Sequence, residues 1–251
     1  MTMAGFALRR ATHDDVEALC DVYLSAFRDE VFSRQVFPRE PSSDTGRAYW
    51  RRAFAEELRE PDATFLVAVE PCYSDDDNDD DGVRAAAAAA VRETAAAVGE
   101  TTAAVGKAAA SRETVVGFVK WVAPGAPPHD FSEDGGGYPP DGLPDVAALY
   151  YKRLFEGHRR CVGDRPHWYL DMVGVRREVM GRGAARQLLD WGLQRAARDG
   201  VPCFVESTGD ARAFYERFGF SEVDRMSVDT PQGEAVVVFM LREGAFAPPN
   251  G

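Results

Sequence analysis

Two glycines, Gly181 and Gly183, stand where an apolar segment passes into an amphipathic one in VGVRREVMGRGAARQLLDWG, residues 173–192. The first amides of a helix have no partner inside it, and the aligned peptide dipoles place about half a positive charge there. Glycine also lets a ligand approach the backbone closely. A strand, a glycine-rich turn and a helix in this order predict a phosphate site. The alternative is a tight turn whose glycines serve only packing.

Two well-known phosphate motifs do not fit this turn. A P-loop needs Lys and Ser or Thr after its glycines, whereas Ala184 and Ala185 follow Gly183. A dinucleotide fold needs a third small residue, and Arg186 stands at that position. Glu206 ends the next strand roughly where such a fold has its acidic residue. We therefore keep a nucleotide-dependent enzyme as one interpretation of the chain.

Strands and helices that alternate along the chain must position this turn. Strands are predicted at 6–12, 63–70, 113–124, 167–175, 201–207, 220–228 and 234–241, and helices at 16–27, 42–61, 146–163, 183–200 and 210–219. Alternation followed by a terminal strand pair predicts an α/β or α+β sheet protein. We expect one domain over residues 1–251.

Two segments break the alternation. Residues 71–112 hold the run DDDNDDD and then alanine-rich text with few large apolar side chains. We interpret them as a disordered or partly helical insertion that joins two strands, the alternative being an interaction tail. Residues 125–144 are rich in glycine and proline, and long loops of this kind often border a binding site.

Composition limits the class of partner. The 251 residues carry a net charge of −12, and six of the negative charges belong to the run at 75–81, so the rest carries −6. This argues against nucleic acid or an anionic membrane and mildly favours a cationic or neutral substrate. The four cysteines have no CxxC spacing, and no stretch nears the ~20 apolar residues of a membrane span. We expect no metal site and a soluble cytoplasmic protein.

Residues 170–224 resemble the acyl-CoA-binding half of the GNAT superfamily of N-acyltransferases, most closely a subgroup common in fungi. The family signature Gln/Arg-x-x-Gly-x-Gly/Ala falls on residues 180–185, with Met180 at its first position. The second signature, Ala-x-x-x-Tyr-x-x-x-Gly-Phe, falls on Ala211, Tyr215, Gly219 and Phe220. The resemblance implies a mixed twisted sheet flanked by helices, with central strands that splay near Gly174. It also implies direct transfer of an acetyl group from acetyl-CoA to the amine of a small molecule or peptide.

The resemblance also implies roles for the cofactor-binding residues. Backbone amides from Gly181 through Arg182, Gly183, Ala184 and Ala185 to Arg186 would hold the diphosphate, and the strand backbone at Val173 and Val175 would receive the pantetheine arm. Two positions depart from the family pattern. Met180 replaces a polar residue, and Thr208 stands where many relatives have Asn and could hydrogen-bond in its place. Arg182 and Arg186 could supply compensating charge.

Three residues are candidates for the chemistry. Tyr215 matches the family's proposed general acid for the departing thiolate, the alternative being a core aromatic. Asp171 lies in the apolar stretch YLDMV and shares a face with Tyr169, at positions where some relatives carry histidines. A buried carboxylate there could have the raised pKa of a general base, or could simply pair with an arginine or cap a loop. Glu206 is the rival base, and the loop histidines His129 and His167 are interpreted as solvated.

The acceptor is not specified by these patterns, nor is the oligomeric state. We expect the contacts with the acceptor to come from residues 27–49 and 125–144, which are the variable segments in this family. A non-catalytic acyl-CoA-binding or sensing module is the main alternative to an enzyme, since it would keep the same pocket.

Overall fold

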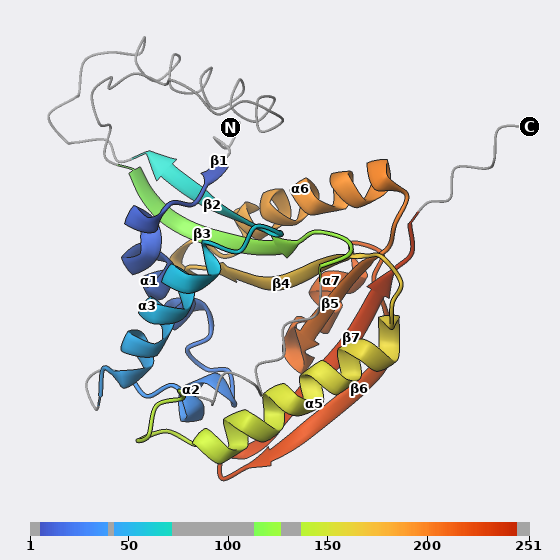
Figure 1. Ribbon diagram of the computed structural model, residues 1–251. Coiled ribbons are helices and arrows are strands. Elements are labelled where there is room, and N and C mark those ends of the chain that lie inside the picture. The colour runs from blue at the N-terminus through green and yellow to red at the C-terminus, as the bar shows by residue number, and fades with distance from the viewer. Residues whose placement is uncertain (1–5, 40–42, 72–112, 127–136, 245–251) are drawn as a thin grey trace, which may run out of the picture.

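The computed structural model describes residues 6–39, 43–71, 113–126 and 137–244. Most of the predicted insertion at 71–112 and the candidate His129 lie outside these residues. Seven strands form one sheet in the order β1-β2-β3-β4-β5-β7-β6 (Figure 1). The strands are β1 (Ala7–Arg10), β2 (Ala63–Pro71), β3 (Glu113–Val122), β4 (Trp168–Val175), β5 (Cys203–Thr208), β6 (Ser221–Thr230) and β7 (Gly233–Arg242).

The two central strands, β4 and β5, are the only parallel neighbours in the described sheet, and they separate part-way along. Their register pairs Trp168–Leu170 with 203–205 and then stops. Beyond that point β4 continues against β3 as far as Val175, and β5 continues against β7 as far as Thr208. Asp171 and Glu206 are thus the first residues past the last pair, at the apex of a splay. The predicted mixed sheet with splayed central strands is confirmed.

Helices cover both faces of the sheet (Figure 1). On one face lie α6 (Ala184–Asp199) and α7 (Arg212–Glu216), and on the other α1 (Val16–Ala26), α3 (Thr45–Glu57) and α5 (Pro144–Val162). A short helix, α2 (Ser33–Val36), was not predicted, and the segment predicted as one helix at 210–219 begins with a 3-10 turn, Gly209–Ala211. No described helix has the length and apolarity needed to cross a membrane.

Side chains alternate between the two faces along each strand, so each face of the sheet has its own hydrophobic core and the polar side chains lie on a defined face. On β3, Phe118 packs toward α1 and α3 while Val119 packs toward α6. Regular alternation places Trp121 with Val119 on the α6 side and Lys120 on the opposite side, and the bulge between Lys120 and Trp121 leaves Asp171 on β4 without a partner on β3. Phe204 packs on α5 and Val205 on α6, so Glu206 also faces α5. The polar residues of the sheet centre therefore converge on the side covered by α1, α3 and α5.

Close approach of α5 to the sheet depends on a glycine. A Cβ atom on Gly157 would lie 2.0 Å from the ring of Phe239 on β7, so only glycine lets the helix lie this close. The next residue, His158, is 5% exposed and faces β4 and β5. The packing of Gly157 therefore places His158 against the splay.

Candidate active site

Two cavities meet at the splay. The larger, of about 1020 Å³, extends from the helices α1, α3 and α5 past β4 to the start of α6 and to α7. The smaller, of about 280 Å³, lies between α5 and the end of β3. Both are lined by Leu154, Tyr169, Asp171 and Glu206. The side chains at the apex of the splay therefore border both spaces.

The turn into α6 has the geometry expected of an anion site. Gly181 and Gly183 have φ angles of 78° and 96°, which L side chains rarely adopt, and a Cβ on either would touch nothing within 4 Å. Gly183 caps the helix without a side-chain hydrogen bond, and Gln187 is the first residue whose amide reaches the helix backbone, at Gly183. Within the described residues, the amides of 183–186 have no acceptor. These donors, with open space before them, fit a diphosphate.

Nine of the ten residues predicted to bind the cofactor line the larger cavity. They are Val173, Val175, Met180, Gly181, Gly183, Ala184, Ala185, Arg186 and Thr208. Met180 is 53% exposed at the turn, and Thr208 ends β5 on the opposite wall. Among the described strands, the edge of β4 from Asp171 to Val175 has no partner on the β5 side, so its backbone can receive a ligand as an added strand would.

Arg182 departs from its predicted role. Its amide donates to the carbonyl of Val179, and its guanidinium lies 2.5 Å from Glu70 on β2 and over the ring of Phe6. It is absent from the lining of the cavity. Arg186 does line it, with a side chain that is 76% exposed and 3.7 Å from Asp190. Of the two arginines expected to add positive charge, only Arg186 therefore lies where it can do so.

Tyr215 lies on α7 and lines the larger cavity on the α6 side of the sheet. It is 6% exposed, and burial raises the pKa of its phenol above its usual value near 10. No hydrogen bond to its hydroxyl is found within the described part of the chain. The hydroxyl is therefore protonated at neutral pH and has a donor to offer. Tyr215 also belongs to the buried core on this face, whereas the neighbouring Phe214 and Phe218 are only partly buried and line the same cavity.

Asp171 belongs to a cluster around Lys120, a residue that the sequence analysis did not single out. Lys120 is 2% exposed, and its ammonium lies 2.8 Å from Asp171, 3.0 Å from Glu57 and 3.0 Å from Glu60. Burial by itself lowers the pKa of Lys120, but the three carboxylates outweigh burial and raise it. Asp171 is thus paired, as one of its two predicted alternatives required, although with a lysine rather than an arginine.

Three carboxylates around one ammonium leave an excess of negative charge in this cluster. Glu57 shows the consequence, because burial, aided by Asp171 and Glu60 and opposed by Lys120, raises its pKa to about 7. Near neutral pH the Glu57 carboxyl therefore holds a proton in part of the molecules. A cation that entered the cavity beside it would favour the ionised form.

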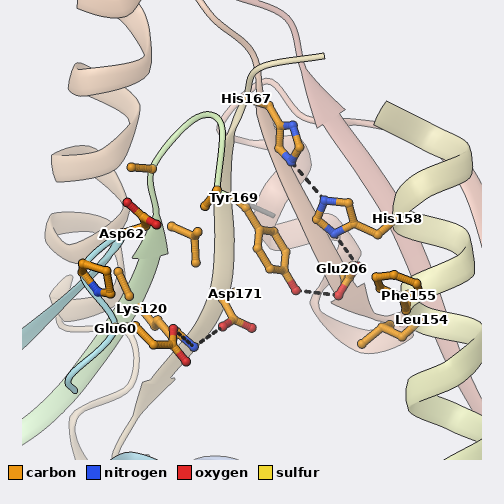
Figure 2. Close-up of a pocket in the computed structure, with 15 residues that line it drawn as sticks. Glu60, Asp62, Lys120, Leu154, Phe155, His158, His167, Tyr169, Asp171 and Glu206 are labelled. Atoms are coloured by element: carbon orange, nitrogen blue, oxygen red, sulfur yellow. Dashed lines mark hydrogen bonds and ion pairs between the residues drawn. The ribbon is translucent and has the colours of Figure 1, made fainter. Parts of the chain in front are cut away.

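Glu206 begins a chain of hydrogen bonds that runs along the wall of the smaller cavity and away from the larger one (Figure 2). Its side chain is 6% exposed, and burial raises its pKa despite the contacts with His158 and Tyr169. The Tyr169 hydroxyl donates to Oε2 at 2.7 Å, and Oε1 lies 3.1 Å from His158 Nδ1. His158 Nε2 lies 3.0 Å from His167 Nε2, and His167 Nδ1 lies 2.7 Å from the carbonyl of Arg165.

The partners in this chain determine where the protons lie. A carbonyl only accepts, so His167 carries its proton on Nδ1, and burial lowers its pKa so that its Nε2 is free to accept. His158 must then donate from Nε2 to His167. A contact between His158 Nδ1 and Glu206 consequently requires one further proton, on either the imidazole or the carboxyl. The contact between Glu206 and His158 therefore holds one shared proton.

The interpretation of His167 as a solvated loop residue is wrong. It comes directly before β4, is only partly exposed, and bonds to a buried helical histidine, His158, nine residues earlier. His158 itself was missed, as were Lys120 and Glu57. The only signal for Lys120 was a lysine inside the apolar stretch VVGFVKWV, whereas the histidine and glutamate lie on amphipathic helices where polar residues are ordinary. No group of three or more possible metal ligands occurs in the described residues.

Comparison with known proteins gives one family. The sequence model described as the acetyltransferase (GNAT) family matches residues 29–220. The fold is similar to that of the crystal structure named histone acetyltransferase HPA2 and related acetyltransferase from Corynebacterium glutamicum, with a TM-score of 0.53, 19% sequence identity and coverage of 97% of this chain and 99% of that one. A PaiA N-acetyltransferase from Thermoplasma acidophilum in complex with coenzyme A aligns with a TM-score of 0.46, 11% identity and coverage of 94% and 97%.

Proposed function

Because the chain belongs to the GNAT acetyltransferase family, we propose that it transfers an acetyl group from acetyl-CoA directly to an amine. The single observation that supports this most is the apex of the splay. There a free strand edge and the open start of α6 border the same cavity as a buried, proton-sharing carboxylate, Glu206. We also propose that residues 1–251 act as one domain around this site.

Binding of the cofactor would fall mainly to the backbone. The amides of 183–186 would hold the diphosphate, and the β4 edge at Val173 and Val175 would align the pantetheine arm. Arg186 would add charge, and Thr208 would offer a hydroxyl from β5. Met180 contributes only apolar contact, and the missing polar contact costs little where amides do most of the binding. When bound, acetyl-CoA supplies an acetyl group activated as a thioester.

Glu206 is the group that we assign as general base. A base must be ionised to act and must hold a proton firmly enough to take it from an ammonium ion, and a raised carboxyl pKa serves both needs near neutral pH. The proton shared with Glu206 would pass to His158 Nδ1 as His158 releases its Nε2 proton to His167, which lies beside exposed Arg165. Glu206 is then ionised and would take the proton of the acceptor amine. Asp171, held by Lys120, would position the acceptor rather than take its proton.

Tyr215 would hold the proton for the departing sulfur. Its hydroxyl is protonated at neutral pH because burial raises its pKa, and it borders the same cavity from the face opposite Glu206. The base and the acid therefore stand on two sides of the splay. This arrangement keeps the proton that leaves the amine separate from the proton that the thiolate receives.

The test is calorimetry with coenzyme A followed by thiol release from acetyl-CoA on a broad panel of amines. We expect coenzyme A to bind, and at least one amine to release thiol in a reaction that yields its acetyl amide. Binding of coenzyme A with no thiol release on any amine would instead identify a non-catalytic acyl-CoA-binding module. Heat from NAD or ATP but none from coenzyme A would favour the nucleotide-dependent alternative.

A further inference from the structure

The half of the larger cavity that lies beneath α1, α3 and α5 has a wall of aromatic rings. Six of them come from three helices and the segment after α1, namely Tyr23, Phe27, Phe32, Trp50, Tyr150 and Tyr151. We call this half the aromatic chamber. The predicted acceptor segments supply Phe27 and Phe32, whereas α5 supplies two tyrosines that lie outside both of those segments.

The rings of the aromatic chamber are fixed by one another. Tyr23 and Trp50 have ring centroids 3.9 Å apart, and Phe32 and Tyr150 stack at 3.8 Å with their planes 17° apart. Tyr151 meets Phe32 edge-on at 5.7 Å. A wall held in this way loses little conformational entropy when a ligand binds, and its faces attract both apolar groups and cations.

Carboxylates border the chamber where it reaches the splay. Glu57, Asp171 and Glu206 line the cavity there, and Lys120 is the one ammonium that contacts them among the described residues. At the other end Asp29 lines the cavity, with Arg177 at 2.5 Å. The charge that faces a ligand at the apex is therefore negative. A carboxylate on the ligand would be repelled there, whereas an ammonium group would be attracted.

We infer that the acceptor is a primary amine joined by a short chain to an aromatic body and carrying no carboxylate of its own. The ammonium would lie among the carboxylates at the apex, beside the general base, while the body would lie against the rings. This inference rests on the proposed function and names its substrate class. A polyamine would leave most of the ring surface without an apolar partner, and an amino acid would bring a carboxylate to the negative end.

A matched pair of probes tests the charge requirement. L-Phenylalanine and 2-phenylethylamine differ only in a carboxylate, so their kcat/KM values in the acetyl-CoA thiol-release assay isolate its effect. We expect 2-phenylethylamine to be better by at least about 100-fold, from the Coulomb energy of one charge near the cluster. Equal values for the two, or a higher value for phenylalanine, would overturn the inference. So would spermidine, the polyamine probe, if its kcat/KM exceeded that of 2-phenylethylamine.

A pair of variants tests the aromatic wall. Tyr150→Leu removes a ring that lines the chamber, whereas Tyr138→Leu removes a ring that stacks on Tyr151 but is not part of the lining. We expect Tyr150→Leu to raise KM for 2-phenylethylamine about 10-fold with kcat nearly unchanged, and Tyr138→Leu to change KM less than about 2-fold. Equal effects of the two variants on KM would contradict a binding role for the wall.

Calorimetry keeps this inference separate from the proposed function. 2-Phenylethylamine is titrated into the full chain saturated with coenzyme A, and we expect heat of binding that Tyr150→Leu reduces. If coenzyme A binds and another class of amine is acetylated while 2-phenylethylamine is not bound, the substrate class is wrong and the proposed function stands. If coenzyme A itself does not bind, the proposed function fails first.

Discussion

The two halves of the larger cavity are built by different means. The cofactor half is mostly main chain from one continuous segment, 173–186, in which two glycines and a row of free amides form the surface. The acceptor half is mostly side chains from α1, α3, α5, β4 and β5, brought together from positions as far apart as Tyr23 and Glu206. A site made of backbone depends on local conformation. A site made of side chains depends on the packing of the whole domain.

This difference explains which departures from the family pattern matter. In the cofactor half Met180 replaces a polar residue and Arg182 is committed to Glu70, yet the amides and the open space before them are intact. In the acceptor half the ionisable side chains at the apex are paired with one another, so the loss of one leaves a buried charge or proton without a counterpart. We therefore expect substitutions in the acceptor half to act on turnover, and those in the cofactor half on affinity for coenzyme A.

The largest effect should come from Glu206→Gln, which removes the base and keeps its shape. We expect kcat to fall about 10²- to 10⁴-fold while the Kd for coenzyme A stays within about 2-fold. The wild-type rate should rise with pH through the pKa of Glu206, which burial places above the ordinary value of 4.5, and this limb should vanish in the variant. Asp171→Asn is the control. If Asp171→Asn abolishes the limb and Glu206→Gln keeps it, the two roles are reversed.

Tyr215→Phe should have the next largest effect on turnover. The ring and its packing remain, so coenzyme A should bind as before, while loss of the hydroxyl should lower kcat about 10- to 100-fold. Stopped-flow thiol release and calorimetry measure the two quantities separately. Unchanged kcat would return Tyr215 to a purely structural role.

Gly183→Ala tests the cofactor half, and Gly200→Ala at the other end of α6 is its matched control. Both glycines have positive φ, 96° and 67°, and for neither would a Cβ meet anything within 4 Å. Each variant should lower the free energy of unfolding by about 1 kcal/mol from backbone strain. Only Gly183→Ala should raise the Kd for coenzyme A, by about 10-fold or more, because only the turn at Gly183 faces the cavity. Equal affinities in the two variants would move the anion site elsewhere.

His167→Ala tests the proton path that leaves the acceptor half. We expect kcat to fall about 10-fold with unchanged KM, and to recover in part when imidazole is added to the buffer. Recovery is the informative measurement, because a histidine that only supports the fold would not be replaced by a free base. Wild-type protein in the same imidazole series is the control.

The last prediction concerns the dependence of stability on pH rather than turnover. The pKa of Glu57 is about 7 in the folded protein against an ordinary value of 4.5, so the folded state binds the extra proton more tightly. The free energy of unfolding should therefore fall as pH rises from about 4.5 to about 7, by up to about 3 kcal/mol from this group. Glu57→Gln should flatten that part of the Tm–pH curve. If the Tm–pH curve of Glu57→Gln matches that of the wild type, Lys120 fully offsets the effect of burial on the proton affinity of Glu57.

Much of the fold could be predicted from the sequence because its elements have clear local signals. The strand at 167–175 and the helix at 183–200 agree with β4 and α6 within one residue at each end, since alternation and capping glycines mark them. The helix α2 was missed because four residues are too few for a periodic pattern. The segment at 210–219 begins as a 3-10 turn, a distinction that periodicity does not make.

The residues of the candidate site likewise divide into those with a local sequence signal and those without one. Gly181, Gly183 and Tyr215 could be found because they stand at fixed spacing within one segment, and the structure places all three on one cavity. His158 and Glu57 could not, because a histidine or glutamate on an amphipathic helix looks like any solvated residue, and the only signal for Lys120 was its place inside an apolar stretch. Their contacts are with residues 48 and 63 positions away, and short-range patterns carry no information about such pairs.

By itself the sequence determined where the chain can bend, cap and expose amides, and hence where a diphosphate can be held. Those properties depend on neighbouring residues and on the conformational freedom of glycine. Only the tertiary structure decided that β4 and β5 part after Leu170 and Val205, which brings Asp171 and Glu206 to one apex and α5 above them. The physical reason is that burial and the proximity of other charges set the proton affinity of a carboxyl, and both come into existence only when distant segments pack together.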